Sequence, residues 1–89
     1  MKINESIQKN KLITFEKGIY IDDEAWIGTH CVIIGNIRIG RHSIIGANSV
    51  VLNSIPDYCV AVGSPAKIIK RYDRESMVWK KTNPQGEFL

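Results

Sequence analysis

Residues 39–50, IGRHSIIGANSV, contain nearly the same hexapeptide twice: Ile39-Gly40 and Ile45-Gly46 each begin a group of six whose fifth residue is a serine. The same frame extends in both directions, and its first positions, which we term anchors, are all aliphatic: Ile21, Ile27, Ile33, Ile39, Ile45 and Val51. The fifth positions are mostly small: Ala25, Cys31, Ile37, Ser43, Ser49 and Ile55. A fixed short period of this kind indicates a repeat architecture.

Neither a helix nor a single strand accommodates this period. A step of six residues turns an α-helix by about 600°, so successive anchors would point in different directions. In a strand the anchors would share one face, but residues 21–56 far exceed the usual strand length of about 3–10 residues. The chain must therefore bend every six residues, where Gly, Asn, Asp or His accept unusual backbone angles. The sequence predicts an all-β solenoid with anchors pointing to its axis and small side chains at its corners.

Composition bounds the functional classes. The 89 residues are 44% hydrophobic and 24% charged, with a net charge of +3, as in an ordinary globular domain. Six cationic and only two acidic side chains fall in residues 67–81, which favours a local anion site over nucleic-acid binding. No apolar run approaches the roughly 20 residues of a membrane span, so we expect no membrane insertion and a cytoplasmic location. Cys31 and Cys59 lack metal-ligand spacing, so we expect free thiols and no metal site.

Two motifs at the ends of the repeat carry a family resemblance. Trp26-Ile27-Gly28, the hexapeptides after it, and the closing VGSPAKIIK of residues 62–70 resemble the C-terminal part of the hexapeptide-repeat acetyltransferases. The most similar type is the maltose, galactoside and bacterial polysaccharide O-acetyltransferases, over residues 19–79. The resemblance implies a left-handed parallel β-helix with three hexapeptides per coil. It also implies a homotrimer that binds acyl-CoA between neighbouring subunits.

The expected domain organisation follows from this frame. Residues 21–56 supply two complete coils, and Phe15 at the preceding frame position begins a partial third, so the β-helix has two to three coils. The spacing of Ile68, Ile69, Tyr72 and Trp79 suggests one helical face in a cap over the open end. The expected segments are an irregular N-terminal segment over the first coil (1–18), the hexapeptide β-helix (19–63), a capping loop and short helix (64–82) and a flexible tail (83–89).

The resemblance also implies residues that contact acetyl-CoA, the acyl donor. Small residues let its long arm lie against the backbone, and lysines attract its phosphates. The pair that is normally threonine and lysine is Leu52 and Asn53 here, which removes a hydroxyl and a charge from that contact. The candidate cofactor-binding residues are Trp26, Thr29, Ala47, Asn53, Lys67 and Lys70.

The catalytic base is the weak part of the resemblance. In the family it is a histidine some two dozen residues before the tryptophan, and residues 1–29 contain no histidine. His30 and His42 both occupy the fourth place of a hexapeptide, where a solvated turn residue is expected. Because they are two hexapeptides apart, which is less than one coil, they should lie at different corners. His30, nearer to Trp26, is the weak candidate for a catalytic role.

Two functions from different classes fit these observations. The first is the C-terminal, acetyl-CoA-binding portion of an O-acetyltransferase that acetylates a sugar hydroxyl, truncated so that it lacks the catalytic histidine. The second is a complete, non-catalytic CoA-binding or structural trimeric module. A weaker third is an active enzyme that uses His30. In each case we expect a homotrimer, with stacking into a larger assembly as a further option because strand edges would otherwise stay unpaired.

Overall fold

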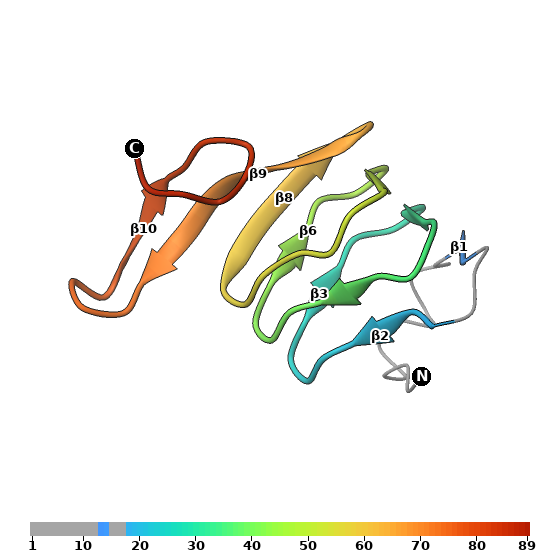
Figure 1. Cartoon of the computed structure of the whole chain (residues 1–89), viewed down its shortest axis with the longest axis horizontal. Helices are drawn as coiled ribbons and strands as arrows, with labels where there is room; N and C mark the ends of the chain where they lie inside the picture. Colours follow the sequence, from blue (N-terminus) through green and yellow to red (C-terminus); the bar gives the residue numbers. More distant parts are fainter. Residues whose placement is uncertain (1–12, 15–17) are drawn as a thin grey trace.

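The chain forms a stack of short coils that continues into an antiparallel sheet (Figure 1). The computed structural model describes residues 13–14 and 18–89 and measures 35 × 23 × 20 Å along its principal axes. Every regular element in these residues is a strand. The strands are β1 (Ile13–Thr14), β2 (Tyr20–Ile21), β3 (Trp26–Ile27), β4 (Val32–Ile33), β5 (Arg38–Ile39), β6 (Ile44–Ile45), β7 (Val50–Val51), β8 (Cys59–Gly63), β9 (Ala66–Asp73) and β10 (Val78–Lys81).

The coils have three walls. The first wall consists of β1, β4 and β7, the second of β2 and β5, and the third begins with β3, β6 and β8. All of these pairings are parallel. Ile21 lies opposite Ile39 and Ile27 lies opposite Ile45, so each anchor pairs with the third anchor after it. Three hexapeptides therefore make one coil, and the predicted solenoid is confirmed.

The register changes at both ends of the stack. Thr14 lies opposite Ile33, so the first-wall frame position falls on Thr14 and not on Phe15. Phe15 itself, and most of the predicted N-terminal segment 1–18, lie outside the described residues. At the other end Ile55 pairs with Ile39, although it comes before the position that would complete three hexapeptides. Ile55 is thus an anchor of the second wall and not the corner residue that the strict period predicts, because residues 52–54 turn the corner by a shorter path.

The core is a column of anchors enclosed by the walls. Ile27, Ile33, Ile39 and Ile45 are completely buried, and the serines at the fifth positions are buried beside them. The hydroxyl of Ser49 donates to the carbonyl of Gly46 (2.7 Å) and accepts from the amide of Gly63 (3.1 Å). A small hydroxyl at this corner therefore satisfies backbone groups inside the tube, as buried polar groups require.

The bends use left-handed backbone conformations at a fixed place in the repeat. His30, His42 and Asn48 have φ angles of 59°, 57° and 61° and each stands fourth in its hexapeptide. Asn and His adopt this conformation more readily than most residues with a Cβ. The expected role of these residues at corners is therefore observed.

The expected short helix in residues 64–82 is not present. Strands β8, β9 and β10 form an antiparallel meander, in which β9 pairs with β8 along one edge and with β10 along the other. The open edge of β8 offers backbone groups that an extended chain can satisfy and a helix cannot. The turn after β9 is closed by a hydrogen bond from the amide of Met77 to the carbonyl of Asp73 (2.7 Å).

The last residues fold back over the open end of the coils. Residues 83–89, expected to be a flexible tail, form a turn in which the amide of Asn83 donates to the carbonyl of Glu87 (2.9 Å), and Phe88 pairs with Thr82. Gly86 is buried in this turn, and a Cβ added to it would come within 3.0 Å of Ile68 Cδ1. The tail thus covers Ile68, the one buried residue that β9 contributes to the core.

Candidate functional site

The corner between the third and first walls brings together Thr29 and Ala47, two of the predicted cofactor contacts. They lie on successive coils, and the amide of Asn48 donates to the carbonyl of Thr29 (2.9 Å). A Cβ on Gly28 would come within 2.6 Å of the Ala47 amide nitrogen, so glycine is required for this close approach. The corner presents small side chains and backbone, a surface against which an extended chain molecule can lie.

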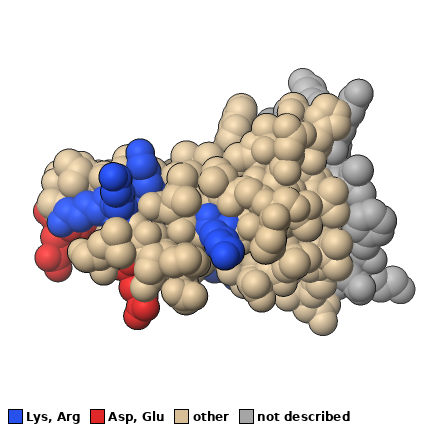
Figure 2. Space-filling view, turned by 90° about the horizontal axis from the view of Figure 1, so that it is seen from above, with Lys and Arg blue, Asp and Glu red and all other residues tan. Residues whose placement is uncertain are grey.

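The turn between β8 and β9 covers the same corner on the next layer. The Gly63 amide is held by Ser49 at 3.1 Å, and Lys67 lies opposite Val62, just after the turn. We name Thr29, His30, Ala47, Asn48 and Lys67 the corner site. Lys and Arg side chains also gather over the end of the molecule that carries β9 and β10, with Asp and Glu at its edge (Figure 2).

His30 belongs to the corner site but lacks an orienting partner there. Its side chain is exposed at the bend, and none of the described residues is hydrogen-bonded or ion-paired to it. A general base is normally oriented by a second group, so this geometry gives His30 no particular support as a base.

Two predicted cofactor contacts lie elsewhere in the chain. Asn53 is exposed in the loop between β7 and Ile55, at the corner between the first and second walls. Lys70 lies opposite Val60 in the middle of the third wall. Within one chain the structure therefore brings Thr29 and Ala47 together, places Lys67 on β9 two strands beyond β6, and puts Asn53 and Lys70 elsewhere.

Trp26 lies on the outer face of the third wall and is 59% exposed. Beside it the Nε2 of His42 lies 3.1 Å from a carboxylate oxygen of Glu24, on the coil below. These residues line a groove of about 460 Å³, within the usual range of small-ligand sites. We name this the aromatic groove; it is lined by Glu24, Trp26, His42, Ile44, Tyr58, Tyr72 and Trp79.

A continuous row of rings runs along the aromatic groove. His42 stacks on Tyr58 with ring centroids 5.1 Å apart, Tyr58 and Tyr72 are 6.1 Å apart, and Tyr72 meets the edge of Trp79 at 5.5 Å. Trp79, which we expected to pack inside a cap, is 41% exposed. The row therefore offers aromatic surface to a ligand.

The pairing of Glu24 with His42 was missed from the sequence. The signal was present, because the two residues occupy the same place in hexapeptides that are separated by one full coil.

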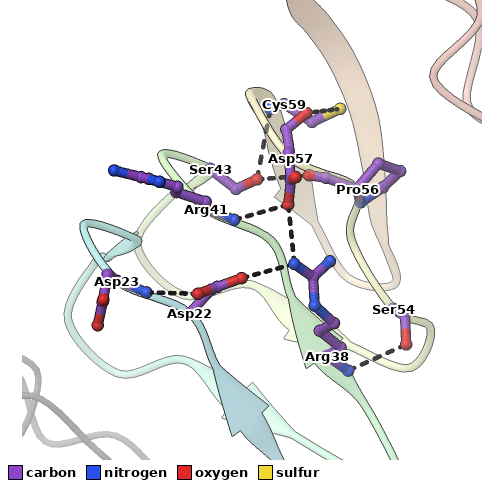
Figure 3. Close-up of polar contacts among 9 residues, drawn as sticks. All are labelled: Asp22, Asp23, Arg38, Arg41, Ser43, Ser54, Pro56, Asp57 and Cys59. Carbon is purple, nitrogen blue, oxygen red and sulfur yellow. Dashed lines mark hydrogen bonds and ion pairs between the residues drawn. The ribbon is translucent and has the colours of Figure 1, made fainter.

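An ion-pair network at the adjacent corner ties three coils together. Arg38 lies between Asp22 and Asp57, with its Nη2 2.5 Å and 3.1 Å from their carboxylates (Figure 3). The backbone amide of Arg41, with the Arg38 guanidinium, lowers the pKa of Asp57 below its ordinary value. Both carboxylates are ion-paired with Arg38, which suits a structural role better than proton transfer.

The remaining reactive groups form no second site among the residues that the structure describes. Cys31 and Cys59 are buried free thiols, and burial raises the pKa of Cys59, which disfavours its thiolate. Within residues 13–14 and 18–89, no group of three or more His, Cys, Asp or Glu side chains is arranged to hold a metal ion. No helix long and apolar enough to cross a membrane occurs in the same residues.

The chain is similar to a known family of repeat proteins and to proteins named as acetyltransferases. Residues 18–53 match the family model described as bacterial transferase hexapeptide (six repeats). WbbJ of Escherichia coli K12, provisionally named a lipopolysaccharide biosynthesis O-acetyl transferase, is 41% identical over 63 residues, which are 71% of this chain and 32% of WbbJ. The chain thus spans about a third of the length of this relative.

Solved structures agree with the fold. A galactoside acetyltransferase in complex with coenzyme A superposes with a TM-score of 0.60 at 40% identity, over 65% of this chain and 29% of that one. The hexapeptide-repeat acetyltransferase VCA0836 of Vibrio cholerae, complexed with acetyl-coenzyme A, also gives 0.60, at 38% identity over 62% and 30%. The expected fold class, a short left-handed parallel β-helix, is confirmed.

Proposed function

We propose, from the premise that this chain belongs to the hexapeptide-repeat acetyltransferase family, that it is the acetyl-CoA-binding part of an O-acetyltransferase that acetylates a sugar hydroxyl. The observation that carries the proposal is the corner site, where Thr29 and Ala47 stack on successive coils and Lys67 lies on β9, two strands beyond β6 in the same wall. Two of the similar structures hold acetyl-coenzyme A or coenzyme A.

The corner site offers the donor two kinds of contact. The pantetheine arm is long and thin, so it requires a shallow path with small side chains, which Thr29 and Ala47 provide. The phosphates require positive charge, and the exposed Lys67 supplies a flexible cation. In this proposal Lys67 is the phosphate contact, and Lys70, on the wall, is free for another ligand.

The transfer step requires more than these residues provide. The sugar hydroxyl oxygen attacks the thioester carbonyl, the carbon–sulfur bond breaks, and CoA leaves as the thiol once it has gained a proton. A base must accept the hydroxyl proton. We propose that this chain binds and positions the donor, and that a histidine outside it completes the site.

The proposed assembly is a homotrimer in the cytoplasm. In the family the donor lies between subunits, so Trp26 and the corner site would face the neighbouring subunit's site. Two buried, unpaired cysteines agree with a reducing compartment. Light scattering tests the assembly, and a stable monomer at micromolar concentration would refute the trimer.

Calorimetry with coenzyme A and acetyl-CoA tests the proposal directly. The 89-residue chain should bind both, and Lys67→Gln should weaken binding about fivefold because one phosphate contact is lost. Lys80→Gln, which removes the same charge from β10, is the matched control and should bind as the wild type does. Absence of binding by the wild type would leave the structural-module alternative.

Thiol release with galactosides as acceptors separates the binding part from an active enzyme. We expect binding with no turnover above background. Turnover that disappears in His30→Ala would instead show that the chain is catalytic by itself and uses His30.

A further inference from the structure

Strands β9 and β10 bring like charges together on both of their faces. In their antiparallel register Arg71 lies directly opposite Lys80, and Lys70 directly opposite Lys81. Like charges at such positions are destabilising unless they are balanced. On one face of this hairpin the like charges are balanced by other groups of the chain, and on the other face they are not.

The pair on the inner face is balanced within the chain. Lys80 forms an ion pair with Asp73 at 2.7 Å, and both Lys80 and Arg71 lie over the ring of Phe88. The hollow on this side, of about 780 Å³, is lined by three arginines and three carboxylates, so it has no excess of either charge.

The pair on the outer face is not balanced. No carboxylate among the described residues forms an ion pair with Lys70 or Lys81. The β9–β10 pairing is regular here, so every second side chain along a strand shares a face. Lys70 therefore lies on the same face as Tyr72, and Lys81 on the same face as Trp79, at the edge of the aromatic groove.

The aromatic groove has the chemistry of a sugar-binding surface. Sugar rings present a face of C–H bonds that packs on aromatic rings, and Tyr72 and Trp79 offer such rings at the surface. The carboxylate of Glu24 and the imidazole of His42 supply polar groups for hydroxyls at the other end of the groove. A neutral sugar would leave the two lysines unmatched, whereas an acidic sugar would neutralise them.

We propose that the aromatic groove binds an acidic saccharide, with sugar rings on Tyr72 and Trp79 and a carboxylate between Lys70 and Lys81. The inference rests on the proposed function and deepens it, because it names the class of acceptor that would be acetylated. The residues named for the corner site do not line the groove, so variants of each can be tested against donor and acceptor separately.

The test is calorimetry of the 89-residue chain with tetragalacturonate and with the same tetrasaccharide after reduction of its carboxylates to hydroxymethyl groups. We expect the acidic form to bind about tenfold more tightly, by a margin that shrinks as salt is added. Lys81→Gln and Lys70→Gln should each remove most of this preference. Trp79→Ala should weaken binding of both saccharides, because it removes ring surface and no charge.

Lys80→Gln is the matched control, since Lys80 precedes Lys81 and faces the other side of the hairpin. The proposal is overturned if this variant loses the preference to the same extent, or if the wild type binds both saccharides equally. It is also overturned if Trp79→Ala changes the oligomeric state, because the groove would then be a subunit contact.

Coenzyme A distinguishes an acceptor site from a phosphate site. If it displaces tetragalacturonate, and Lys81→Gln weakens both ligands equally, the lysine pair belongs to the donor and the inference fails while the proposed function stands. If acetyl-CoA does not bind at all but the acidic saccharide does, the proposed function fails and the groove remains a saccharide site.

Discussion

The coils and the β8–β10 sheet are built from strands but are stabilised differently. In the coils each hexapeptide buries one anchor completely or almost so, and the anchors of successive coils stack along the axis. In the hairpin β9 buries only Ile68, and all four residues of β10 are exposed. Stability should therefore depend on the coils, while the hairpin, with its side chains on the surface, is where ligand-binding groups can vary.

The largest expected difference in unfolding free energy is between two variants, each of which replaces one isoleucine by alanine in one of the two regions. Ile39→Ala leaves a cavity in the middle of the stack, between Ile21 and Ile55, and should cost about 2–5 kcal/mol of unfolding free energy. Ile69→Ala, in the hairpin, removes a side chain that is 42% exposed and should cost less than about 1 kcal/mol. Urea denaturation measures both. Equal losses would show that the hairpin stabilises the fold as much as the coils do.

Glycine substitutions test what each region tolerates at close contacts. A Cβ on Gly40 would lie 2.4 Å from the amide nitrogen of Asp57. Because this neighbour is backbone, the clash can be relieved only if the two coils move apart. A Cβ on Gly46 would meet Val62 Cγ1 at 2.6 Å, a side chain of β8 that can rotate. We expect Gly40→Ala to cost about 1–3 kcal/mol and Gly46→Ala distinctly less.

Thermal unfolding of the two glycine variants gives the comparison. A larger loss of thermal stability for Gly46→Ala than for Gly40→Ala would mean that the junction between coil and hairpin is more rigid than the contact between the coils.

Ser49→Ala tests the connection between the regions. The change leaves the Gly63 amide without its hydrogen bond at the start of the β8–β9 turn, which should cost about 1–2 kcal/mol. Ser54→Ala, whose hydroxyl accepts from the exposed Arg38 amide, is the control and should cost less. Hydrogen exchange should show faster exchange at Gly63 in the Ser49 variant and no change there in the control.

The smallest expected effect is on stability at acid pH, through Asp73 in the hairpin. Lys80, with Ser76 and the Glu75 amide, lowers the pKa of Asp73 to about 2. Because the folded-state pKa lies below the ordinary value near 3.9, the contribution of this carboxylate is present above about pH 4 and is lost as the pH falls toward about 2. NMR titration of the Glu75 amide should show this low midpoint, and Lys80→Gln should raise it. A midpoint near the ordinary value in the wild type would contradict the contact.

The repeat predicted the coils well because each hexapeptide contains the residues that specify its own conformation. Anchors, small corner residues and left-handed bends recur at the same places, so Ile27, Ser43 and His42 could each be assigned from spacing. The prediction failed where the period changes, at Thr14 and Ile55. A corner that is slightly longer or shorter than the others cannot be recognised from the periodicity of the sequence. It becomes visible only in the pairing of the strands.

Thr29, Ala47 and Lys67 were named from the motifs, and their role in binding the donor stays a prediction. Thr29 and Ala47 lie at one corner on successive coils, and Lys67 lies on β9 opposite Val62. The Glu24–His42 contact and the unbalanced Lys70–Lys81 pair were not predicted. Both depend on which residues face each other across strands, and that information is spread over distant parts of the chain.

The sequence by itself determined the solenoid, its coil length and the inward direction of its anchors, because these follow from a local period that any coil must obey. Only the tertiary structure decided that residues 64–82 contain strands and that aromatic rings from the coils and from the β9–β10 hairpin line one groove. The physical reason is that an apolar spacing such as that of Ile68 and Tyr72 fits a helix or a strand equally. The exposed edge of β8, which requires hydrogen-bond partners, selects the strand.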